Sequence, residues 1–185
     1  MNENPPVIAL VGFLAATRYT RPDWAAPTLP EGDLISMTEC MTDVVTAEPW
    51  DPFFTEPPVA PPGHHVLAVG VPVDYLPALR ADLEDWLPPL LAEPRAVPDW
   101  PVLGHELIGA DHGSWHTWTC LGGLVSEVGA ATGVQPGPWG LIPDEHDARR
   151  AADWLTESIP GEHEVYLWVP ALLLSSTPPA PSTPR

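Results

Sequence analysis

The sequence contains no lysine. It has seven arginines and 25 aspartates and glutamates, so the formal net charge is −18 at pH 7. Nucleic acids and anionic membranes bind proteins through clustered basic side chains that displace counterions. A chain this poor in cations lacks such a cluster, which argues against nucleic-acid and membrane partners. The same charge favours a basic protein partner, and solubility alone is the alternative explanation.

Cysteine is also scarce, since only Cys40 and Cys120 occur in 185 residues. That number is not typical of a small secreted scaffold, and the sequence leaves open whether the two residues pair. The N-terminus has no basic region of a signal peptide, and the apolar run 7–16 is too short to span a bilayer. We therefore expect a cytoplasmic protein.

Several catalytic motifs are missing as well. The sequence has no GxGxxG loop, no phosphate-binding loop ending in Lys-Ser/Thr and no GxSxG nucleophile elbow. These absences remove the commonest nucleotide-binding and hydrolase signatures. We expect no cofactor, and the sequence leans against an enzyme.

Proline, by contrast, is abundant: there are 27 prolines, whereas average usage would give about nine. They are dense in residues 48–63, EPWDPFFTEPPVAPPG, which can be neither a helix nor a central strand. We expect a long, proline-stiffened lid whose aromatic side chains fold back onto the domain. A polyproline ligand for an aromatic groove is the alternative, and the lack of a PxxP repeat with basic flanks argues against it.

Apolar runs and helical periodicity predict an α+β fold. We expect a single domain over residues 1–174, with a mostly antiparallel or mixed sheet of about four to five strands and three helices packed on it. The tail 175–185 should be disordered. The expected strands are 7–14, 34–45, 65–73, 102–110 and 165–174, the last of them bent or at an edge because of Pro170.

The three expected helices each have a capping residue and an apolar face. One begins at Asp74, one at Ser114 with Gly133 as its C-terminal cap, and one at Asp144 and runs to about residue 156. The spacing of apolar residues predicts their buried faces. These are Leu76, Leu79, Leu83, Trp86 and Leu87 for the first, Trp118, Leu121, Val125, Val128 and Thr132 for the second, and Ala148, Ala151, Ala152 and Leu155 for the third, with Trp154 beside it.

Two groups of residues could carry a function. The first is a metal set of His105, Asp111, His112 and His116, in which two histidines are four residues apart. The zincin pattern is not met, because Gly113 follows the first histidine of this pair, and surface histidines are the simpler interpretation. Cys120 could pair with His116 as a thiolate, but a buried inert thiol is favoured because the helix dipole would be weak there.

The second group consists of anchors for a protein partner. Two long stretches, 22–79 and 96–148, carry only acidic charges, so one face of the fold could be strongly negative. Aromatic side chains within such a rim are typical binding anchors. The candidate partner-binding residues are Trp50, Asp51, Phe53, Phe54, Glu56, Trp115 and His116.

The stretches GHELIGADHGSWHTWTCLGGL, TGVQPGPWGLIPDEHDARRAADWL and VYLWVPALL, within about residues 103–173, resemble small uncharacterised acidic actinobacterial proteins. Some of those proteins look like immunity proteins encoded beside toxins. The resemblance implies a binding protein and carries no catalytic residues over to this chain.

Charge and resemblance together predict a non-enzymatic inhibitor of a basic toxin or nuclease. The alternative is a small metal-dependent enzyme or metal-binding protein built on the metal set. A third interpretation is an accessory protein with a structural role.

Overall fold

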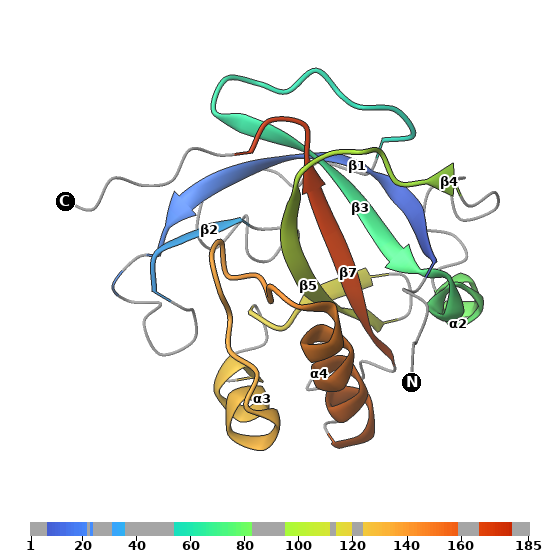
Figure 1. Cartoon of the computed structure of the whole chain (residues 1–185), viewed down its shortest axis with the longest axis vertical. Helices are drawn as coiled ribbons and strands as arrows, with labels where there is room; N and C mark the ends of the chain where they lie inside the picture. Colours follow the sequence, from blue (N-terminus) through green and yellow to red (C-terminus); the bar gives the residue numbers. More distant parts are fainter. Residues whose placement is uncertain are drawn as a thin grey trace.

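A computed structural model describes residues 7–21, 23, 31–35, 54–82, 95–111, 114–119, 124–158 and 167–178. Over these ranges the chain forms one antiparallel sheet with three α-helices packed against it (Figure 1). The predicted α+β class is therefore confirmed. The described sheet has seven strands, more than expected.

The strand order is β2-β1-β3-β7-β5-β6, with β4 also pairing with β1. Every strand pair is antiparallel. The strands are β1 (Ile8–Thr20), β2 (Asp33–Ile35), β3 (His64–Pro72), β4 (Arg95–Ala96), β5 (Val102–Asp111), β6 (Ser114–Thr117) and β7 (Leu167–Ser175). Ser175, assigned to the tail from sequence, is the buried last residue of β7.

Both faces of the sheet carry apolar cores, because most strands are apolar at consecutive positions. Along β7, Val169, Ala171 and Leu173 join the core beneath β1, β3 and α2. Trp168 on the opposite face joins the core beneath α3 and α4. A third, smaller core around Phe13 is covered by Val97 and Trp100. The near-continuous apolar run 102–110 suggests a strand covered on both faces at least in part, and the consecutive buried residues 104–109 confirm this, whereas Val102 is exposed.

The long strand β1 has β3 along one edge and three short segments along the other. These segments are β4 at Ala9 and Leu10, Phe54 at Phe13, and β2 at 18–20. A continuous open edge invites pairing with another chain, and short covering segments prevent it. The segment 54–63 is therefore attached to the sheet at its start.

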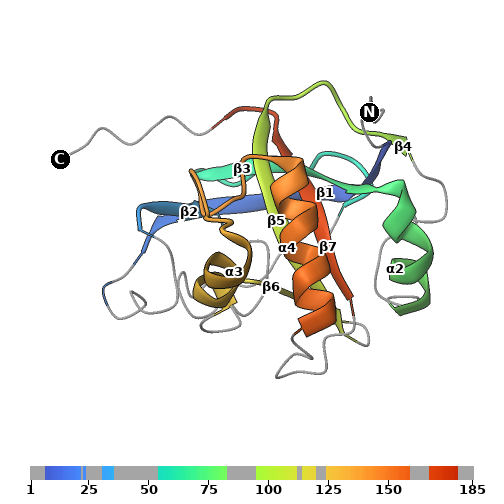
Figure 2. The same cartoon turned by 60° about the horizontal axis from the view of Figure 1, so that its bottom comes forward.

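The helices follow the sheet in three places. The 3₁₀ turn η3 (Val73–Tyr75) leads into α2 (Leu76–Asp82), followed later by α3 (Leu124–Thr132) and α4 (Glu145–Ser158). Figure 2 shows α4 in front of β5 and β7, α3 beside α4, and α2 at the far end of β3. Of these helices, none has the length and apolar character needed to cross a bilayer.

The helix predicted from Asp144 is confirmed in its cap and in its buried face. The backbone N–H of Asp147 donates to Asp144 Oδ1 at 3.1 Å, which is the expected N-cap bond. The four predicted inward residues are all fully buried: Ala148, Ala151, Ala152 and Leu155. Local sequence signals were sufficient here because cap and apolar face agree.

The helix predicted from Ser114 begins too early. Residues 114–117 form β6, which pairs with the end of β5, and α3 starts only at Leu124. The apolar spacing that predicted this helix begins only at Trp118, and Ser114, expected to cap the helix, instead pairs with Asp111 in β5. The far end of the helix was predicted correctly, because Gly133 has φ +76° and its N–H donates to Gly129 O at 3.0 Å.

Two further predictions need correction. Asp74 does not cap a helix: Pro72 occupies the N-cap of η3 without a side-chain bond, and the Asp74 carboxylate accepts from Arg149 instead. The strand β7 is not at an edge of the sheet, since it lies between β3 and β5. The strand β7 pairs with β3 only from Leu172 to Ser175. Pro170 therefore has a partner strand only on the β5 side, and this is how a central strand accommodates the proline.

Other predictions fall in ranges outside the description. These are most of the predicted strand 34–45, the helix residues Leu83, Trp86 and Leu87, both cysteines and most of the tail.

Candidate functional site

The structure divides the predicted anchor residues between two separate places. Phe54 lies on the outer edge of β1, where its N–H and C=O both bond to Phe13, with N···O distances of 2.7 and 2.9 Å. Its side chain stays 38% exposed, so it only partly folds back onto the domain. Trp115 and His116 lie on β6, at the other end of the strand order. Trp50, Asp51 and Phe53 are outside the described residues.

Glu56, the remaining predicted anchor, is engaged by a basic side chain. Its carboxylate accepts from Arg95 on β4 at 3.2 Å, and both side chains remain at least half exposed. This ion pair ties segment 54–63 to a strand about 40 residues further along the chain. Three residues beyond Glu56, Val59 is 98% exposed.

The predicted metal residues are distributed along a hairpin. His105 and Asp111 lie six positions apart on β5, so their Cα atoms are about 20 Å apart at about 3.3 Å per residue. His116 pairs with Gly109, four positions from His105, and His112 is outside the described residues. The atoms that bind one metal ion lie within about 2.6 Å of it. Two side chains whose Cα atoms are about 20 Å apart cannot both reach the same ion, so His105 and Asp111 do not share one. Among the described residues, no three His, Cys, Asp or Glu side chains come together as a metal site.

His105 is instead part of the buried framework. Its Nδ1 lies 3.2 Å from the carbonyl of Ile142, and since a carbonyl only accepts, this nitrogen is the donor. Gly104 has φ +147°, and a Cβ there would lie 2.8 Å from Leu141 Cβ, so glycine permits the close approach of residues 141 and 142. Burial lowers the pKa of His105 and outweighs the Ile142 carbonyl and nearby carboxylates, which raise it. Burial therefore favours the neutral form of this imidazole.

Glu106, the next residue, is a buried carboxyl that the sequence analysis missed. It is 2% exposed and pairs across the sheet with Ala171, within the apolar core that contains Ile108 and Val169. Its Oε1 accepts from the N–H of Leu107 at 3.0 Å. Burial raises the pKa of this carboxyl well above its ordinary value, and the Leu107 bond lowers it only in part. The available signal was one acid within a strand that is apolar on both faces.

Two buried tryptophans also have unsatisfied polar groups. The indole Nε1 atoms of Trp118 and Trp168 are buried without a hydrogen-bond partner. Both rings lie in the core beneath α3 and α4. Trp118 was expected to be buried, and it is, although it follows a strand and does not lie on a helix.

A surface cluster joins α4 to η3. Arg149 donates to Asp74 at 2.9 Å and to Glu145 at 3.1 Å, and its guanidinium lies 5.5 Å from the ring centre of Tyr75. The Arg149 bond lowers the pKa of Asp74, while the pKa of Arg149 is raised. Burial, followed by the charge of Asp153, raises the pKa of Tyr75 to about 12. These shifts are those of a structural ion pair that attaches a helix.

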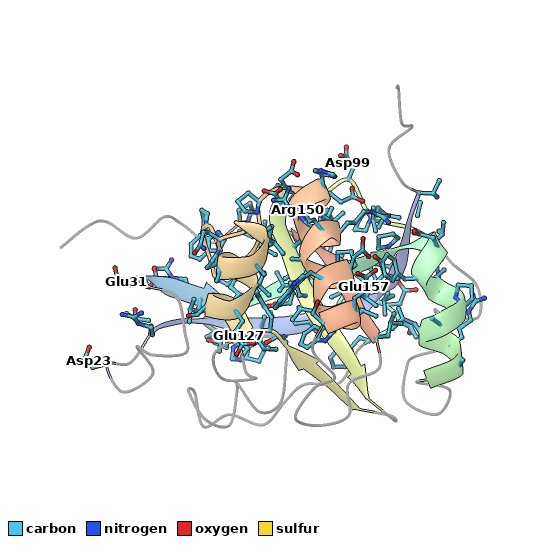
Figure 3. All side chains as sticks on the ribbon, turned by 90° about the horizontal axis from the view of Figure 1, so that it is seen from below. Asp23, Glu31, Asp99, Glu127, Arg150 and Glu157 are labelled. Carbon is cyan, nitrogen blue, oxygen red and sulfur yellow. The ribbon has the colours of Figure 1, made fainter. Side chains whose placement is uncertain are left out.

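The described arginines are almost all neutralised by the chain itself. Five of the six lie within 4.0 Å of a carboxylate oxygen; the pairs are Arg18–Asp33, Arg21–Glu31, Arg95–Glu56, Arg149–Asp74 and Arg150–Asp147. The surplus carboxylates are therefore left without an internal counter-charge. In Figure 3 the labelled acids are spread around the molecule, with Asp23 and Glu31 at one end, Asp99 at the top and Glu127 beside α3. These acids do not gather on one face.

No family model matches the sequence, and comparisons with curated proteins and with solved structures likewise found no similar protein. Interpretation of function therefore depends on the residues of this chain.

Proposed function

We propose that this chain is a non-enzymatic acidic binding protein that holds a basic protein partner, as an immunity protein holds a toxin or nuclease. The observation that carries the proposal is the pairing of five of the six described arginines with carboxylates of the same chain. Because the cations are used internally, a net charge of −18 acts outward with little local compensation.

A surface of one sign accelerates association with an oppositely charged protein and repels similar ones. The labelled acids lie apart from one another in Figure 3, so attraction would come from the total charge, and a contact segment would determine orientation. Segment 54–63 supports this role, because Glu56 and the exposed part of Phe54 lie in it. The cytoplasm is the proposed location.

Salt titration tests the proposal. The probe is the purified basic product of a neighbouring reading frame, and hen lysozyme serves as a basic control protein of unrelated origin. Raising the ionic strength from about 0.01 M to about 1 M shortens the Debye length from about 30 Å to about 3 Å. We expect the dissociation constant for the neighbour to rise steeply over this range, and lysozyme, which matches only the charge, to bind more weakly than the neighbour at every ionic strength. Binding that ignores salt, or no binding of a basic neighbour, would contradict the proposal.

The metal-dependent alternative has less support. It would have to be built from Asp111, His112 and His116 without His105, whose Cα lies about 20 Å from that of Asp111 along β5. Metal analysis of the purified protein addresses it directly, since a real site would retain close to one equivalent.

A further inference from the structure

Segment 54–63 crosses the molecular surface as a strap held at both ends. At its start Phe54 makes two backbone hydrogen bonds to Phe13 in β1. At its end the N–H of His64 donates to Pro61 O at 3.1 Å, just as β3 begins. Figure 1 shows this segment in teal along the top of the molecule, on the side away from α3 and α4.

Between these ends the backbone has little freedom. Prolines at 57, 58, 61 and 62 fix their own φ near −65°, and each also restricts the residue before it to extended conformations. Of residues 56–62, only Val59 is neither a proline nor followed by one. The prolines therefore favour a polyproline II conformation, which has about three residues per turn and no internal hydrogen bonds, over residues 57–61, between the bend at Glu56 and the turn at 62–63.

The same residues point their apolar surface outward. Val59 is 98% exposed, the highest value among the large hydrophobic side chains that the structure describes. Pro57, Pro61 and Pro62 are exposed as well. Covering the edge of β1 requires Phe54 alone, so protection of the sheet does not account for the apolar surface that follows.

The structure also places a basic side chain beside the segment, where the neighbouring sequence has none. Arg95, from β4, lies beside Glu56 at the N-terminal end of the prolines, and its side chain is 50% exposed. A polyproline II helix looks similar from either direction, so a charged group at one end can determine the orientation of a partner. A basic flank was the element missing from the sequence when a polyproline ligand was considered.

We infer that residues 57–61 form a preorganised polyproline II segment that docks into an aromatic-lined groove of another protein, with Val59 as its apolar anchor and the Arg95–Glu56 ion pair beside its first proline. The inference names the contact segment and the shape of the partner's site, and it does not require the partner to be basic. Because the segment is stiffened before binding, little conformational entropy is lost on docking.

Binding of the full-length chain to a panel of purified proline-recognising domains of SH3, WW and EVH1 type tests the inference, with basic and acidic domains both represented. Isothermal titration gives the affinity, and amide shifts in ¹H–¹⁵N spectra locate the contact. We expect at least one domain to bind and to shift the amides of Val59 and Ala60 without shifting those of α3 or α4.

Two variants and two matched controls make the result decisive. V59D and the double variant Pro58→Ala/Pro61→Ala should each weaken binding by about tenfold or more, since they remove an apolar anchor or the backbone stiffness. V7D adds the same charge at another exposed valine, and Pro77→Ala removes an exposed proline from α2; both should bind like the wild type. Circular dichroism confirms that each variant is folded.

No binding by any domain would overturn the inference, as would loop variants that bind as tightly as the wild type. Binding confined to basic domains supports the inference together with the proposed function. Binding that includes acidic domains supports the inference alone.

Discussion

His105 and Glu106 are consecutive residues of β5, and their side chains lie on opposite faces of the sheet. The unbroken pairing from Gly104↔Leu173 to Ala110↔Leu167 establishes this, because side chains alternate along a regular strand. His105 bonds to Ile142 near the start of α4, whereas Glu106 stands opposite Ala171 within the apolar core. Two titratable groups are thus buried next to each other in sequence without facing each other.

The buried carboxyl should make stability fall as the pH rises. The pKa of Glu106 is raised in the folded state, so its contribution is fully present below the ordinary unfolded value of about 4.3 and is lost as the pH rises through the folded value. The loss is at most about 1.4 kcal/mol per pH unit for one proton. E106Q replaces the carboxyl by an amide that does not titrate. The difference between the urea midpoints of the wild type and of E106Q should therefore decline steadily as the pH rises above about 5. E127Q on exposed α3 is the control, and parallel curves for wild type and E106Q would contradict the prediction.

Replacing a buried tryptophan by phenylalanine should cost little. Trp118 and Trp168 each bury an indole N–H that has no partner, and removing such a donor recovers about 1–3 kcal/mol. That recovery offsets the smaller ring volume, so W168F should unfold within about 1 kcal/mol of the wild type. W168A should lose about 3–5 kcal/mol, since it leaves a large cavity. Urea denaturation followed by far-ultraviolet circular dichroism measures both variants, and equal losses would show that the N–H is satisfied in solution.

The N-cap of α4 should contribute measurably to stability. Asp144 accepts from the N–H of Asp147, and replacing a capping aspartate by alanine costs about 0.5–2 kcal/mol. E157A, at an exposed position near the other end of the same helix, changes the charge equally and should alter stability by less than about 0.5 kcal/mol. Chemical denaturation of D144A and E157A compares the two directly; equal effects would mean that only charge matters.

The ion pair between Asp74 and Arg149 should be a weak, salt-sensitive link. Both side chains are partly exposed, so the coupling in a double-mutant cycle with D74N and R149Q should be below about 1 kcal/mol. The pKa of Asp74 is lowered in the folded state. Its contribution is therefore present above the ordinary value of about 3.9 and is lost as the pH falls through the folded value. A coupling energy unchanged by about 1 M salt would show that the pair is not electrostatic in origin.

Elements whose signals are local were predicted well. The strand 65–73 differs from β3 by one residue at each end, and the strand 102–110 extends to Asp111 in β5. The buried face of α4 matched at every position. In each of these cases the apolar pattern, the turn residues and the length agree.

Elements that depend on strand pairing were predicted poorly. Residues 114–117 were placed in a helix because Ser114 can act as a cap, yet they form β6, which pairs with the end of β5 in a tight hairpin. Pro170 indicated a bent or edge strand, and β7 lies between β3 and β5, with its pairing to β3 confined to residues beyond the proline. The metal hypothesis treated His105 and Asp111 as neighbours, although an extended strand separates them.

Composition by itself determined the sign of this molecule's electrostatic field, since 25 acids and seven arginines leave the same excess of negative charge in any fold. The sequence also determined the stiffness of residues 56–62, because the proline ring acts on its own residue and the one before it. Only the tertiary structure decided which carboxylates neutralise the arginines and that Glu106 is enclosed by the core. Charge and ring geometry are local properties, whereas burial and ion pairing depend on which distant segments the sheet brings together.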